Sequence, residues 1–145
     1  MKKLYIILLS LVTTASFSQA TDLFFSQYGE GSSNNKFLEI YNGTGQDVDL
    51  SNYAFPSVAN APDVPGTHEY WNDFPEGAVV ANGDVYVIAH PSASDEITAT
   101  ADHFHQYLSN GDDGYALALG TEEQYSIVDY YILFYCNYDK QQVCK

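Results

Sequence analysis

Short hydrophobic runs separated by turn residues recur from residue 23 onward, and this rhythm constrains the fold more than any other feature of the chain. In Lys36–Tyr41 the residues Leu38 and Ile40 share one side of an extended segment, which is the period of a half-buried strand. Val85–Ala89 is apolar throughout, which predicts a central strand. Further strands are expected at 23–28, 48–50, 53–55, 69–71, 115–119 and 125–128.

One stretch has a helical pattern. Ser92 and Asp95 have the spacing of a capping box, and Ile97 begins an apolar series with a helical period. Two threonines weaken this pattern, so we expect a short helix at about 94–101. Seven or so short strands with regular turns then predict an all-β fold, an antiparallel β-sandwich with one short helix.

The composition limits the kinds of partner. Without its first twenty residues the chain keeps three lysines and no arginine against nineteen acids, a net charge of −16 with neutral histidines. This charge repels phosphate backbones, so direct nucleic-acid binding is not expected. Affinity for divalent cations is compatible with it. Thirteen tyrosines and eight phenylalanines provide apolar surface for a core, and the dominance of tyrosine fits a β fold.

The first twenty residues have the features of a signal peptide. Two lysines precede a largely apolar run at 4–12, and small residues lead up to Ala20. We therefore expect cleavage between Ala20 and Thr21, with secretion to the extracellular space or the cell surface. The apolar run is far shorter than the roughly 20 residues that span a bilayer, and no later segment is long and apolar enough, so no membrane span is expected after cleavage.

Four segments carry a resemblance to a known family: LFFSQYGEGSSNNKFLEIYN at 23–42, VDLSNY at 48–53, FPEG through GDVYVIA at 74–89, and SNGDDGYAL at 109–117. Their order and spacing resemble those of bacterial lamin tail domains, in the style of secreted Bacteroidetes-type proteins. The resemblance implies an immunoglobulin-like antiparallel β-sandwich at 21–129, without enzymatic activity or a cofactor of its own. In secreted bacterial proteins such domains accompany nucleases, phosphoesterases and other hydrolases, or act as tethering and interaction modules.

The end of the chain departs from this family pattern. The family continues after Asp129 with a segment rich in Gly, Asp and Trp, whereas 130–145 reads YYILFYCNYDKQQVCK. Either a divergent last strand replaces the usual edge, or the chain is truncated or out of frame there and the domain is incomplete. The missing Gly and Trp favour the second interpretation. Cys136 and Cys144 lie close enough in sequence for a local disulfide, which spacing alone does not decide.

Histidines provide one set of candidate metal ligands. His103 and His105 could place two imidazoles on one strand face. No third ligand has characteristic spacing, so these are interpreted as surface histidines, as are His68 and His90.

A turn rich in oxygen donors provides the other set. Asn110, Asp112 and Asp113 could contact calcium, but glycine occupies the place of the terminal glutamate of an EF-hand. The resemblance implies a structural role for this turn. Asp112 and Asp113 are the metal candidates that remain, with calcium as the cofactor they would bind.

No catalytic residues are predicted. Glu30 and Glu39 are the carboxylates to consider for glycoside hydrolysis, but one lies in a glycine-rich turn and the other in mid-strand. Asn42 begins a glycosylation pattern that we interpret as a turn. Trp71 with Tyr70 could stack on a sugar, although packing at the core or its rim is favoured.

These observations predict a secreted, non-catalytic β-sandwich module for cell-surface attachment or for interaction with an unknown protein or ligand. The alternative is the N-terminal accessory-domain fragment of a secreted nuclease or phosphoesterase, and the reading frame beyond Lys145 distinguishes the two.

Overall fold

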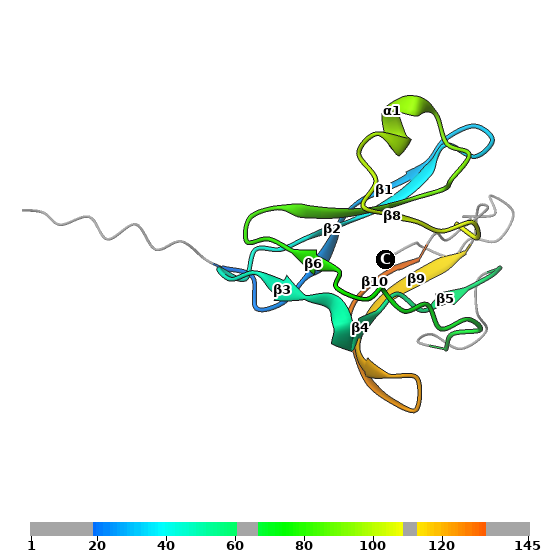
Figure 1. Ribbon diagram of the computed structural model, residues 1–145. Helices are drawn as coiled ribbons and strands as arrows, with labels where there is room; N and C mark the ends of the chain where they lie inside the picture. Colours follow the sequence, from blue (N-terminus) through cyan, green and yellow to red (C-terminus); the bar gives the residue numbers. More distant parts are fainter. Residues whose placement is uncertain (1–18, 61–66, 109–112, 133–145) are drawn as a thin grey trace, which may run out of the picture.

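The strands of the computed structural model form two facing sheets and one small extra pair (Figure 1). The structure describes residues 19–60, 67–108 and 113–132. The first sheet has the order β1-β2-β7-β8: Phe24–Glu30, Lys36–Tyr41, Val85–Ala89 and His103–Phe104. The second has the order β10-β9-β4, with β5 also paired to β9: Gln124–Ile132, Gly114–Thr121, Tyr53–Ala54 and Ser57–Val58. β3 (Val48–Asp49) pairs with β6 (Val79–Val80) beside them.

The pairing is antiparallel throughout except between β7 and β8. The predicted sandwich and the predicted strand at Val85–Ala89 are confirmed. β8 was not predicted, and a 3-10 helix at Leu50–Asn52 follows β3, where the sequence pattern had suggested only extended chain.

The core forms where the inward residues of the two sheets meet. Leu38 lies opposite Ile88 and Ile40 opposite Tyr86 in the ladder between β2 and β7, and all four are buried. From the second sheet, β9 contributes Tyr115 and Leu117, and Phe55 joins the same cluster from the segment after β4. The alternation read from Lys36–Tyr41 is therefore confirmed, because burying one face of a strand removes every second side chain from water.

The first and last described strands close one side of the sandwich. The backbone N–H of Phe25 in β1 donates to Asp129 Oδ2 in β10 at 2.8 Å. Tyr28 follows Phe25 by three residues and Tyr131 follows Asp129 by two. Their rings stack with centroids 4.6 Å apart. β10 extends through Ile132, so the first residues after Asp129 belong to this strand. The predictions for residues 133–145, including the pairing of Cys136 with Cys144, lie outside the described residues.

The helix is shorter than its sequence pattern suggests. α1 spans Asp95–Thr98 and lies over the first sheet, on the side away from the second (Figure 1). The hydroxyl of Thr98 donates to the carbonyl of Ser94 and that of Thr100 to Ile97, and such local bonds compete with helix propagation. Ser94, and not Ser92, occupies the N-cap position, and it makes no side-chain capping bond.

Candidate binding site

An extended segment, residues 67–73, lies along the edge of the second sheet and carries the main candidate site. Single bridges pair Ser57 with Tyr70 and Ala54 with Asp73. The amide of Asn72 donates to the carbonyl of Phe55 at 2.9 Å and to Ser57 Oγ at 3.1 Å, so the segment is held at both backbone and side-chain level. The predicted strand at 69–71 is thus an edge segment paired through isolated bridges.

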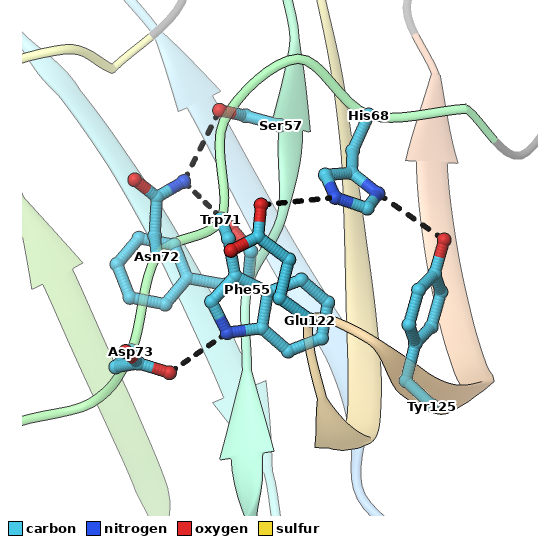
Figure 2. Close-up of polar contacts among 8 residues, drawn as sticks. All are labelled: Phe55, Ser57, His68, Trp71, Asn72, Asp73, Glu122 and Tyr125. Carbon is cyan, nitrogen blue, oxygen red and sulfur yellow. Dashed lines mark hydrogen bonds and ion pairs between the residues drawn. The ribbon is translucent and has the colours of Figure 1, made fainter.

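Three rings from distant parts of the chain meet on the outer face of this sheet (Figure 2). The centroids of Trp71 and Tyr125 are 5.1 Å apart, and His68 lies 5.4 Å from each. Tilted and edge-to-face pairs at these separations are the favoured arrangements of aromatic rings. We call His68, Trp71 and Tyr125 the ring cluster.

The ring cluster bridges the sheet from one edge to the other. Tyr125 belongs to β10 and Trp71 to the opposite edge segment, with β4 and β9 between them. Rings in contact at 5.1 Å must therefore meet above the middle strands, where Ala54 and Ala118 are fully buried and Gly120 lies opposite Tyr125. Small residues on the middle strands make this arrangement possible.

Polar contacts fix the orientation of the rings (Figure 2). Trp71 Nε1 donates to Asp73 Oδ1 at 2.8 Å. His68 Nδ1 lies 3.2 Å from the hydroxyl of Tyr125, and its Nε2 lies 3.9 Å from Glu122 Oε1, an ion pair when the imidazole is protonated. The bond to Asp73 thus orients Trp71, and the contact between His68 and the Tyr125 hydroxyl orients the other two rings.

The same face continues along β10 with exposed apolar side chains. Ile127 pairs with Ala118 and Tyr130 with Ala116. These two alanines flank the inward-facing Leu117 in β9, so they and their partners face outward. A bulge between Ile127 and Asp129 keeps Tyr130 on the outer face despite the odd spacing. Ile127 is 40% and Tyr130 67% exposed. We call Trp71, Tyr125, Ile127 and Tyr130 the outer stripe.

Trp71 packs at the rim of the sheet, as the sequence favoured, and its ring partners are not its neighbour Tyr70. Successive residues of an extended segment point to opposite sides, and no ring contact within the described parts of the chain joins these two side chains. Tyr70 is 60% exposed. His68, interpreted from sequence as a surface histidine, is the third member of the ring cluster, and its side chain is 19% exposed.

His103 and His105 are half-buried at the edge of the core, not on an open loop. Both rings pack edge-on against Phe55, with centroids at 6.0 and 5.2 Å. Burial lowers the pKa of both imidazoles, and the charges of His103 and His90 lower that of His105 further. His90 Nδ1 accepts a bond from the N–H of Ser92 in the following turn. Between residues 19 and 132, the parts that the structure describes contain no group of three or more side chains able to hold a metal ion.

Of the calcium candidates, Asn110 and Asp112 lie outside the described residues. Asp113 Oδ1 accepts from the backbone N–H of Asn60 at 2.8 Å, which ties the chain after β5 to the start of β9. Asp113 therefore has a structural contact with the neighbouring loop.

The remaining sequence candidates have structural roles. Glu30 accepts from the hydroxyl of Tyr28 at 3.2 Å, and Glu39 accepts from Ser26 Oγ at 2.7 Å. Asn42 is fully buried, and its amide donates to the carbonyls of Gln46 and Val80. The turn interpretation of Asn42 is confirmed.

Two facing, mainly antiparallel sheets around one apolar core define an immunoglobulin-like β-sandwich. The chain belongs to the lamin tail domain family, whose model matches residues 16–131. A search of curated proteins gives no match. Within the described residues, no helix has the length and hydropathy needed to cross a membrane.

Proposed function

We propose that this chain is a secreted, non-catalytic lamin tail module of the Bacteroidetes type, which attaches to the cell surface or to a protein partner through the outer stripe. The observation that carries the proposal is the exposed apolar face of the second sheet. Tyr and Trp are enriched at protein interfaces because they combine a large apolar area with few rotatable bonds. The outer stripe presents such side chains in a row, on a rigid sheet.

The packing of the stripe supports binding by a preformed surface. Trp71 and Tyr125 are held by each other and by the polar contacts of Asp73 and His68, so little ordering is needed when a partner arrives. Tyr130 and Ile127 remain exposed beside them. Secretion is supported by the basic start, the apolar run and the small residues of 1–20.

Cell binding by stripe variants tests this function. Labelled protein spanning 21–145 should bind saturably to intact cells of the organism that encodes it, and the double variant Trp71→Ala/Tyr130→Ala should lose at least about tenfold in affinity. Tyr107→Ala is the matched control, because Tyr107 is 78% exposed but lies outside the stripe. Equal binding by both variants, with thermal melts showing folded proteins, would contradict the proposal.

The departure from the family pattern in 130–145 supports one alternative, an accessory-domain fragment of a secreted nuclease or phosphoesterase. A downstream reading frame that encodes a Gly-, Asp- and Trp-rich ending and a hydrolase domain would favour it. A stop codon with no such continuation would count against it.

A further inference from the structure

The opposite face of the molecule contains a depression of about 480 Å³, on the outer side of the first sheet. Its walls come from β1, β2, β7 and the segment that carries α1. This volume lies within the range of pockets that hold small ligands. None of the residues that line the depression belongs to the outer stripe.

Apolar side chains form part of this depression. Phe37, Val85, Val87 and Ile97 all line it. The ring of Phe37 lies across the strand-paired Gly29, so close that a Cβ at position 29 would collide with it. The absence of a side chain at Gly29 therefore gives the ring its place beside the depression.

Four carboxylates line the same depression: Glu39, Asp84, Glu96 and Asp102. Uncharged donors orient three of them, since Glu39 accepts from Ser26 Oγ, Asp84 from the N–H of Val85 and Asp102 from the N–H of Val87. Bonds from its own N–H and from Ser94 lower the pKa of Glu96. Each carboxylate has two oxygens with several lone pairs, so capacity to accept further bonds remains.

No positive charge of the described chain lines this depression. Lys36 is the one lysine or arginine among the described residues, and it is only 5% exposed. Its position next to Phe37 in β2 places it on the other side of the strand. The negative charges around the depression are thus complementary to a cation from outside.

We propose that this depression binds a lysine side chain of a partner protein. A lysine combines an aliphatic stem with a terminal ammonium, which matches apolar walls beside carboxylates. The inference rests on the proposed interaction function and adds the chemistry of the partner, a segment that presents lysine. It uses a different face from the outer stripe, so the two assignments are tested by different variants.

Amide chemical shifts of labelled protein report the site directly. The probe is the peptide acetyl-Gly-Ser-Lys-Ser-Gly-amide, and its match is the same peptide with Nε-acetyl-lysine. We expect the lysine peptide to shift the amides of β2, β7 and α1 and to leave those of the outer stripe unchanged. The acetylated peptide should bind at least about fivefold more weakly, because it lacks the charge.

Replacing carboxylates by amides of the same shape distinguishes the effect of charges in the depression from the effect of the net charge of the protein. Glu39→Gln/Asp102→Asn keeps an acceptor oxygen for Ser26 and Val87 and should weaken lysine-peptide binding about fivefold. Glu76→Gln/Glu123→Gln removes the same net charge from exposed turns and should leave the affinity within twofold. Equal losses in both double variants would overturn the proposal, as would equal binding of the two peptides.

Two further measurements complete the test. Val85→Lys places a lysine of the chain itself in the depression and should abolish peptide binding in a protein that still melts cooperatively. Spermine binding in the depression without lysine-peptide binding would identify a free polyamine as ligand and overturn the assignment to a protein partner. Loss of cell binding in the stripe variants leaves this result unaffected, and the reverse holds as well.

Discussion

The outer faces of the two sheets differ in how they meet solvent, although both sheets contribute to one apolar core. On the second sheet, small residues of β9 face outward, and the rings of Trp71 and Tyr125 reach over them from the two edges of the sheet. The first sheet presents apolar side chains beside four carboxylates, under the segment of α1. One core can thus support two chemically distinct surfaces, because alternation along each strand separates packing from surface chemistry.

A glycine on each face provides the sharpest test of this independence, and Gly120 should have the larger effect. Its φ of +126° is unfavourable for other residues, and a Cβ there would collide with the backbone carbonyl of Gln124. We expect Gly120→Ala to lower the free energy of unfolding by about 2–4 kcal/mol. Urea denaturation measures the loss, and the emission of Trp71, the single tryptophan, should change because Tyr125 moves. A shift of less than about 0.5 kcal/mol would show that this hairpin adapts freely.

Gly29→Ala should have a smaller and differently placed effect. The obstructing atoms belong to the ring of Phe37, which can rotate, so we expect a cost of about 1–2 kcal/mol. The ring then leaves its place beside the depression, and lysine-peptide binding should weaken several-fold. Emission of Trp71 should stay native at low urea. A changed emission would mean that the two faces are mechanically coupled.

Acid should lower the stability of the protein through the two half-buried histidines, His103 and His105. Burial lowers the pKa of His103 and His105, so the unfolded chain binds protons more readily than the folded one. Their contribution to stability is complete above the unfolded pKa of about 6.5 and is lost as the pH falls through the lowered folded-state values. The melting temperature should therefore drop by a few degrees between about pH 7.5 and 5.

The variant His103→Gln/His105→Gln is the control for this pH effect, since it keeps all acidic residues. Its melting temperature should fall less over the same range. Parallel curves for the two proteins would assign the pH dependence to other groups.

Salt should produce the smallest effect, and it should change the binding affinity of the depression more than that of the outer stripe. Raising NaCl from about 50 mM to about 500 mM shortens the screening length to a few ångströms, which weakens exposed charge pairs. Lysine-peptide affinity should fall several-fold, whereas binding through the outer stripe should change by less than twofold. Equal salt dependence at both surfaces would remove the chemical distinction between them.

The fold could be predicted from sequence to the extent that local periodicity determines it. In Lys36–Tyr41 and Val85–Ala89 the pattern of apolar side chains alone indicates which residues are buried. β8 could not be recognised, because two residues carry no period, and the apolar series from Ile97 suggested a longer helix than α1.

Both candidate surfaces depend on contacts between distant residues. Tyr125 follows His68 by 57 positions, and no local pattern connects them. Packing of Trp71 at the core or its rim was favoured from its residue type, but its ring partners His68 and Tyr125 could not be named. The depression could not be predicted at all, because Glu39 and Asp102 meet only after β2 and the segment around α1 have packed together.

The contact between Phe25 and Asp129 joins residues 104 positions apart, which has a consequence for the order of folding. Chain closure over such a separation costs entropy before any contact repays it, so folds of this kind form slowly. β1 lies near the start of the described chain and β10 at its end, so this edge of β1 is covered only when nearly all of the described residues are free to fold. The sandwich is therefore completed only when its first and last strands are available together.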